Sequence, residues 1–174
     1  GAGYYEVADE KNQKFYTEKY GVTHPTKPGL KIPEMFDAAI NKELKGLWII
    51  GEDIVQTDPN SAHVVEAMNS LELLVVQEIF MSETAKLATV VLPGTTFLEK
   101  DGTFTNTERR IQRVNRAVQP LPGTKPDGVI VTDMMQKLGF DQPTYDADQM
   151  LNEIADIVPF FKGVTRERLG KLGL

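Results

Sequence analysis

The sequence of 174 residues contains no cysteine and only two histidines, His24 and His63. Without cysteine, the chain has no disulfide, no thiolate zinc site, no iron–sulfur ligation and no cysteine nucleophile. Two histidines make a histidine-based metal centre unexpected, and no other metal ligand set stands out. No Ser–His–Asp arrangement is indicated either, because the sequence marks no partner for either histidine. We therefore assign neither catalytic nor metal-ligating residues to this chain.

Long apolar runs are also missing. The most apolar segments, 47–50 and 71–76, are far shorter than the ~20 residues that a membrane-spanning helix needs. No targeting segment is visible, and we expect a cytoplasmic protein. The chain opens on Gly-Ala-Gly without methionine, which predicts a processed chain or a piece of a longer protein.

The sequence also has little clustered positive charge. The net charge is −6, and no basic stripe is evident, which argues against binding to a nucleic-acid backbone. Neither of the common glycine-rich phosphate loops, G-x-G-x-x-G after a strand or G-x-x-x-x-G-K-[ST], is present. Hydrophobic residues make up 41% of the chain and charged residues 25%, a composition typical of a globular domain with a real core.

Helix-like and strand-like segments alternate through the middle of the chain. Asp58 followed by Pro59 is a favourable helix start, and β-branched and aromatic residues fill the apolar runs. The predicted order is helix, strand, helix, strand, short helical turn, strand, over residues 33–41, 47–50, 59–70, 71–76, 82–83 and 89–92. This order predicts an α/β fold with a three-layer parallel sheet and crossover helices.

The chain divides into three predicted regions. Residues 1–42 form an N-terminal helical lead-in with a helix over about 9–20, and residues 43–140 form the α/β domain. Within that domain, 97–113 reads as a polar loop with short extended pieces. A helix is expected from Val129 to Leu138, with Asp127 preceding it, and the remainder, 141–174, is a helical tail. The tail helices are expected over 147–157 and 165–172.

Two predicted strands end in polar residues that could bind a ligand. Gly-Glu-Asp at 51–53 follows the first strand, and Gln-Glu at 77–78 follows the second. In an open parallel sheet, ligands lie outside the carboxyl ends of the strands. Carboxylates there accept hydrogen bonds from ribose hydroxyls or from the N–H edge of guanine, and glycine allows close approach. Spacing alone favours the simpler interpretation, that these acidic residues cap loops.

At these same residues the sequence resembles the molybdopterin oxidoreductase family, and within it the alpha (catalytic) subunits of formate dehydrogenases. The resemblance runs from about Tyr4 to the end of the chain. It rests on four motifs in the family's order: G-E-D at 51–53, V-V-Q-E-I-F-M-S-E-T-A at 75–85, V-L-P at 91–93 and E-K-D-G-T-F-T-N-T-E-R-R at 99–110. Without the resemblance, the last of these motifs reads as a solvated charge run or as a loop pressed against another surface.

The resemblance implies a dinucleotide-binding domain like that of formate dehydrogenase and dimethylsulfoxide reductase. Members of the family hold molybdenum or tungsten between two molybdopterin guanine dinucleotides, and the matching domain grips one of them. Gly51, Glu52 and Asp53 match the guanine and ribose contact, with Asp53 as the carboxylate that reads guanine. Thr57, in the same loop, is a further cofactor contact suggested by the match. The family often has proline where Ile54 stands, so this loop is expected to be less rigid.

Four more cofactor-binding residues follow from the resemblance. Gln77 and Glu78 match the pair that ends the next strand and contacts the nucleotide, although relatives often have aspartate at position 78. Lys100 matches a lysine that approaches the dinucleotide phosphates or ribose. Asp127 matches a further acidic contact.

The resemblance implies that this chain is a C-terminal-side fragment of a formate dehydrogenase alpha subunit. The parent would oxidise formate to carbon dioxide, and its catalytic cysteine or selenocysteine and its iron–sulfur cluster would lie elsewhere. Expected partners are the rest of that subunit and electron-transfer iron–sulfur subunits. The sheet is expected to be partly open, with its edge and apolar surface exposed or covered by a second copy.

Two other interpretations stay open. The chain could be the same region of another molybdopterin oxidoreductase, such as a nitrate reductase or the large subunit of a respiratory NADH dehydrogenase. It could also be a stand-alone, non-enzymatic nucleotide-binding or partner-binding module.

Overall fold

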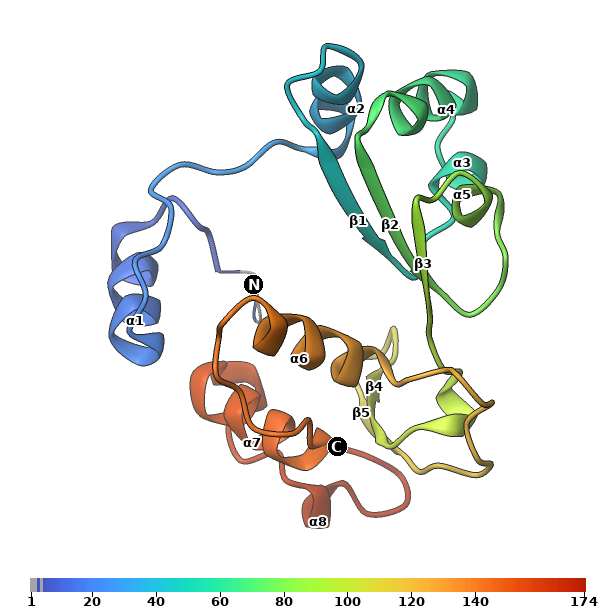
Figure 1. The fold of residues 1–174 in the computed structure, drawn as a ribbon. Helices are drawn as coiled ribbons and strands as arrows, with labels where there is room; N and C mark the ends of the chain where they lie inside the picture. The colour runs from blue at the N-terminus through green and yellow to red at the C-terminus, as the bar shows by residue number, and fades with distance from the viewer. Residues whose placement is uncertain (1–2, 4) are drawn as a thin grey trace.

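The computed structural model describes Gly3 and residues 5–174, so Tyr4, where the expected resemblance begins, lies outside the described residues. A parallel sheet with helices packed on it forms one part of the molecule (Figure 1). A β-hairpin with the C-terminal helices forms a second part, below the first in this view. The two parts have separate hydrophobic cores.

The sheet has three parallel strands in the order β1 (Gly46–Ile50), β2 (Leu73–Glu78) and β3 (Val90–Pro93). Ile49 is opposite Val76, which is in turn opposite Val91. Because side chains alternate along a strand, these three side chains lie on the same face of the sheet. That face of the sheet forms one side of the larger hydrophobic core.

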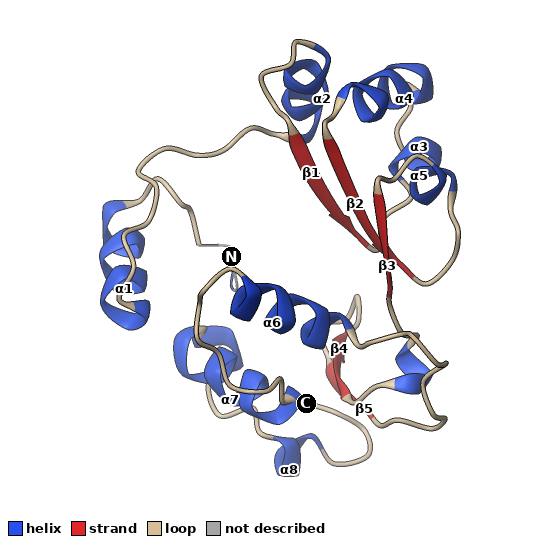
Figure 2. Ribbon diagram, viewed as in Figure 1, coloured by secondary structure: helices blue, strands red, loops and turns tan. Residues whose placement is uncertain are grey.

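Helices α2 (Ile32–Ile40), α3 (Ile54–Thr57), α4 (Ser61–Ser70) and α5 (Glu83–Lys86) belong to this core (Figure 2). Their buried residues meet those of the strands in one cluster: Phe36, Ala39, Ile54, Val64, Ala67, Met68 and Ala85 against Ile49, Leu74 and Val76. The fully buried side chains each contribute roughly 1.5–3 kcal/mol through removal of apolar area from water. The predicted α/β class, with a parallel sheet and crossover helices, is confirmed.

Helix α6 (Asp127–Lys137) meets the opposite face of the sheet at the end of β3. Lys125 N donates to the Pro93 carbonyl at 3.1 Å, and Ile130 and Met134 line a cavity with Leu92. The third layer therefore covers this end of the sheet. Further from α6, the side chains of Ile50, Leu73 and Val90 on the same face are exposed, as the open-sheet expectation anticipated.

The second part begins with the short helix η2 (Phe97–Glu99) and the antiparallel hairpin of β4 (Gly102–Thr105) and β5 (Ile111–Val114). Helices α7 (Ala147–Ile157), η3 (Pro159–Phe161) and α8 (Arg166–Leu169) complete it. Its small core consists of Ile111, Leu151, Val164 and Leu169, with Phe161 packed beside it. The predicted polar loop with short extended pieces is thus a hairpin that contributes one buried side chain.

The N-terminal helix α1 (Glu10–Tyr20) packs on the second part, although it lies at the other end of the chain. Asp9 caps its first turn by accepting from two backbone N–H groups. The Tyr20 hydroxyl donates to Glu153 at 2.8 Å, and the Tyr5 hydroxyl donates to the Ile157 carbonyl at 3.1 Å. These bonds join the expected lead-in region to α7.

Several predicted helix boundaries differ from the structure. The helix expected from Pro59 begins at Ser61 with Asn60 as its N-cap, because Asp58 instead follows the last residue of the unpredicted helix α3. Helix α6 begins at Asp127, two residues earlier than expected. The helix expected over 165–172 has a single turn, Arg166–Leu169, because Gly170 takes a positive φ of 51°. No described helix has the length and hydropathy needed to cross a membrane.

Candidate functional site

The polar residues predicted at the strand ends lie side by side in the structure. Strand β1 leads into Gly51, whose φ of 64° is a left-handed conformation that favours glycine. The Gly51 N–H donates to the Gln77 carbonyl on the neighbouring strand at 2.9 Å, so the two strand ends stay in register. The exposed Gly51 has open space around its α-carbon, which leaves room for a ligand against the backbone.

Asp53 is held by four hydrogen bonds from the protein itself. Its Oδ1 accepts from the Thr84 N–H at 3.0 Å and the Thr84 hydroxyl at 2.7 Å. Its Oδ2 accepts from the Glu83 N–H at 3.3 Å and the Gln56 side chain at 2.8 Å. Partial burial alone would raise the pKa of Asp53, but these donors outweigh it and hold the pKa below its usual value.

This arrangement gives Asp53 a structural role, because it joins the loop after β1 to the start of α5. Three of its four donors are backbone or buried groups, whereas Gln56 is exposed. A ligand N–H can therefore reach Asp53 Oδ2 if the Gln56 side chain swings into solvent.

Glu52 and Thr57 lie on the outer side of the same loop, and both are exposed. The Thr57 hydroxyl donates to Glu52 Oε1 at 2.9 Å, which braces the loop across α3. Glu78, at the end of β2, accepts from the Ile79 N–H at 2.6 Å. The carboxylates of Glu52 and Glu78 have further acceptor capacity toward solvent.

Gln77, Lys100 and Asp127 come from three different elements and meet as one cluster. The Gln77 amide donates to Asp127 Oδ1 at 2.8 Å, and the Lys100 ammonium pairs with Asp127 Oδ2. Desolvation would raise the pKa of Asp127, yet the hydrogen bonds from Lys100 and Gln77 and the Lys100 charge lower it overall. The resemblance named these three residues separately as cofactor contacts, and the structure brings their side chains into direct contact with one another.

Two buried oxygens near this cluster have no hydrogen-bond partner among the described residues. They are Gln77 Oε1, in a side chain that is only 1% exposed, and Thr95 Oγ1. Gly94, the residue before Thr95, lies close to the cluster, since a Cβ at Gly94 would be 3.3 Å from Asp127 Oδ1. Buried polar atoms without a partner are costly, and they indicate a place where a bound group or water completes the bonding.

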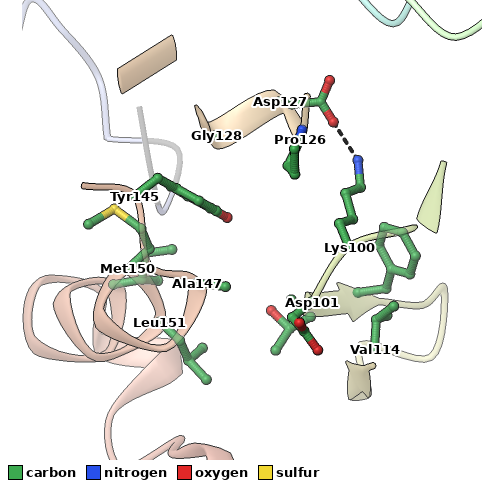
Figure 3. A pocket seen from close by; sticks show the side chains of 14 residues that line it. Lys100, Asp101, Val114, Pro126, Asp127, Gly128, Tyr145, Ala147, Met150 and Leu151 are labelled. Atoms are coloured by element: carbon green, nitrogen blue, oxygen red, sulfur yellow. Dashed lines mark hydrogen bonds and ion pairs between the residues drawn. The ribbon is translucent and has the colours of Figure 1, made fainter. Parts of the chain in front are cut away.

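An open pocket of about 260 Å³ begins at the Lys100–Asp127 pair and runs between the hairpin and α7 (Figure 3). Tyr145 points across it from the segment before α7, toward Lys100. A tyrosine phenol is protonated at neutral pH and can donate a hydrogen bond. Burial, followed by the nearby charges of Asp127 and Asp146, raises the pKa of Tyr145 further. Apolar side chains of Phe104, Val114, Met150 and Leu151 form the remaining walls.

Glu99, the first residue of the E-K-D-G motif, is a buried structural carboxylate. It accepts from the Thr96 N–H at 2.9 Å, the Thr96 hydroxyl at 3.1 Å and the Leu121 N–H at 3.0 Å. The Thr96 N–H, which contributes most, and the other two donors lower the pKa of Glu99. Glu99 thereby fixes the segment from which Lys100 extends toward Asp127.

Sequence reasoning did not select Thr84, Thr95 or Tyr145 as parts of the site. Thr84 and Thr95 lie inside or beside quoted motifs, but no pattern distinguishes a threonine that supports a carboxylate from an exposed one. Tyr145 stands in a polar segment without a recognisable motif. Its place in the pocket depends on how the segment before α7 packs against the first turn of α6 at Gly128, which a local pattern does not encode.

The comparison with known protein families agrees with the fold and with the polar strand ends. The family model described as molybdopterin oxidoreductase matches residues 7–137, and the chain belongs to this family. The resemblance expected from the four motifs is therefore confirmed.

Among its relatives, the F420-dependent formate dehydrogenase subunit alpha of Methanocaldococcus jannaschii is 43% identical over 169 residues. That match covers 96% of this chain and 25% of the relative. The putative formate dehydrogenase YrhE of Bacillus subtilis is 40% identical over 167 residues, covering 96% of this chain and 17% of the relative. The chain thus spans a quarter or less of the length of these curated relatives.

A solved structure has the same fold over most of the chain. Acetylene hydratase from Pelobacter acetylenicus superposes with a TM-score of 0.64 at 20% sequence identity. The match covers 90% of this chain and 22% of that enzyme. At this identity the likeness concerns the fold, and it agrees with a domain like that of the dimethylsulfoxide reductase family.

Family membership implies a molybdopterin cofactor, and the residues at the strand ends fit a polar group of this kind. The unpartnered oxygens of Gln77 and Thr95 require donors, and the open space at Gly51 admits a ligand to the backbone. Within the described part of the chain, no group of three or more histidine, aspartate or glutamate side chains is placed to hold a metal ion.

Proposed function

We propose that this chain binds one molybdopterin guanine dinucleotide through the carboxyl ends of β1 and β2. The observation that carries the proposal is the convergence of Gly51, Asp53 and Gln77 with the Lys100–Asp127 pair at one edge of the sheet. Carboxylates suit the N–H edge of guanine and the ribose hydroxyls, and the ammonium suits a phosphate. These groups come from separate segments, which is typical of a binding site rather than of local capping.

Each predicted residue has a role in this proposal. Asp53 accepts from the guanine N–H edge after Gln56 moves aside, while Glu52 and Thr57 shape the loop around the base. Glu78 accepts from a ribose hydroxyl. Lys100 exchanges part of its contact with Asp127 for a phosphate oxygen, and Asp127 keeps Gln77 and Lys100 in place.

We further propose that the chain is part of a formate dehydrogenase alpha subunit that oxidises formate to carbon dioxide. Support comes from the identities of about 40% to proteins with that name over nearly the whole chain. The bound cofactor, with molybdenum or tungsten, supplies the redox chemistry in the parent, and iron–sulfur subunits accept the electrons. This chain supplies binding and orientation, since it contains neither cysteine nor an assigned catalytic residue.

Isothermal titration calorimetry with GDP and ADP tests the binding proposal on the chain itself. We expect GDP to bind more tightly than ADP, because the amino and N–H groups on the guanine edge match a carboxylate. Asp53→Asn removes the charge that accepts these bonds and should weaken GDP binding about tenfold or more, with ADP binding little changed. Asp141→Asn, at an exposed carboxylate away from the strand ends, is the matched control.

A thermal melt of each variant accompanies the titration, because Asp53 also supports α5. Loss of GDP preference in a folded Asp53→Asn variant supports the proposal. Equal binding of GDP by this variant and the wild type contradicts the assignment of Asp53.

A further inference from the structure

An exposed apolar loop follows directly on the candidate site. It comprises residues 79–82, between the end of β2 and the start of α5. Phe80 is 75% exposed and Met81 is 63% exposed, and Ile79 beside them is also exposed. Consecutive exposed apolar side chains of this size indicate a surface that contacts something else.

The backbone of this loop is fixed in spite of its exposure. The Ile79 N–H donates to Glu78 Oε1 at 2.6 Å, and the Ser82 N–H donates to the Phe80 carbonyl at 2.9 Å. Ser82 Oγ then caps α5 by accepting from the Ala85 N–H at 3.1 Å. The Phe80 ring therefore projects from a held turn, which lowers the entropic cost of using it as a contact surface.

The helix that follows this loop contacts the residue proposed to read the purine. This helix, α5, supplies the Glu83 and Thr84 N–H groups that donate to Asp53. Strands β1 and β2 are adjacent and parallel, so the segments after them border the same edge of the sheet. Phe80 and Asp53 thus stand on two neighbouring segments that border one edge of the sheet.

We propose that Phe80 is the surface on which the purine ring of the dinucleotide stacks. This inference rests on the proposed function and adds to it a residue that recognises the shape of the base. Aromatic stacking uses the π-face that every base has, so it contributes affinity without distinguishing guanine from adenine. Asp53 distinguishes guanine from adenine, whereas Phe80 contributes affinity for either base. The two effects can be measured separately.

Phe80→Ala tests this division of roles in the full chain by calorimetry. We expect the variant to bind both GDP and ADP about 5- to 100-fold more weakly, and by similar factors, because stacking serves either base. Phe80→Trp keeps a stacking surface and should retain GDP binding. Phe160→Ala removes a side chain that is 87% exposed on η3, and this matched control should bind like the wild type.

Fluorescence gives a second, direct readout. In Phe80→Trp, the tryptophan emission above that of Trp48 should be quenched as GDP saturates the site, whereas in Phe160→Trp it should not change. If Phe80→Ala binds GDP within twofold of a wild type that does bind, or if the quenching is absent, the stacking role is overturned and the proposed function stands. If the wild type does not bind GDP, both are overturned.

Discussion

At the scale of single residues, two carboxylates organise the candidate site. Asp53 accepts four hydrogen bonds, and Asp127 accepts from Gln77 and pairs with Lys100. Both carboxylates therefore have a structural role in the protein without a ligand. In the proposed binding mode, a ligand replaces one contact at each carboxylate, that of Gln56 with Asp53 and that of Lys100 with Asp127.

Gln56→Ala should increase the affinity for GDP about two- to fivefold. The exposed Gln56 amide occupies Asp53 Oδ2, and its removal frees that oxygen for a ligand N–H without disturbing the donors from α5. Calorimetry on the variant measures the gain, with Gln149→Ala at an exposed position of α7 as the control. Weaker binding by Gln56→Ala would mean that Gln56 itself contacts the nucleotide.

Stability should fall in acid partly through Asp127. Its folded-state pKa lies below the unfolded value of about 3.9, so its contribution is present above that pH and is lost as the pH falls through the folded pKa. Urea midpoints measured from pH 7 downward should therefore decrease less steeply below about pH 5 in Asp127→Asn than in the wild type. Asp141→Asn should follow the wild-type profile, and an unchanged profile in Asp127→Asn would contradict this role.

The predictability of the site differs from residue to residue. Position next to a strand end predicted Gly51, Asp53 and Gln77 as neighbours, because parallel strands end at one edge. The sequence did not indicate that Thr84 would donate hydrogen bonds to Asp53, since that contact depends on how α5 packs against the loop after β1.

At the scale of elements, the first turn of α6 depends on a glycine. A Cβ at Gly128 would collide with the Tyr145 ring, which lies directly against this turn. Glycine inside a helix otherwise costs about 1 kcal/mol relative to alanine. Its presence here is explained by the contact with Tyr145, which in turn walls the pocket beside Lys100.

Gly128→Ala should therefore lower the free energy of unfolding by about 1–3 kcal/mol, in spite of the better helix propensity of alanine. Urea denaturation measures the loss. The double variant Gly128→Ala/Tyr145→Ala should be more stable than Tyr145→Ala alone, because the collision is gone and only the propensity gain remains. An additive result in this cycle would show that the two residues do not interact.

Element prediction succeeded where local signals were strong. The strands were expected from their apolar content, and the helix expected over 147–157 is present, with Asp146 as its N-cap. The start of α4 was predicted wrongly, because Asp58 and Asn60 are both acceptable N-caps and the choice depends on the short helix α3 before them. The hairpin was missed as a hairpin, since its strands are short and carry mostly polar residues.

At the scale of the whole molecule, the candidate site contains a polar link between two separate cores. The sheet core and the small core of Ile111, Leu151, Val164 and Leu169 share no residues. Gln77 on the sheet, Asp127 on α6 and Lys100 before the hairpin form a polar link between them. A ligand at this link would stabilise both parts.

Leu169→Ala should destabilise the second part by about 2–5 kcal/mol, because Leu169 is fully buried in the small core. Native-state hydrogen exchange should show faster exchange in α7 and β5, with β1 and β2 protected as in the wild type. Leu172→Ala, at an exposed position, is the control. Equal acceleration in both parts would show a single cooperative unit.

A titration of the ¹⁵N-labelled chain with GDP, followed by amide NMR shifts, shows directly whether a guanine nucleotide binds at the ends of β1 and β2. We expect saturable shifts at the ends of β1 and β2, including Gly51, Asp53 and Glu78, and at Phe80, with the amides of α1 and α8 unaffected. Saturable shifts elsewhere, or no shifts at the strand ends at millimolar GDP, would contradict a guanine nucleotide site at this edge of the sheet.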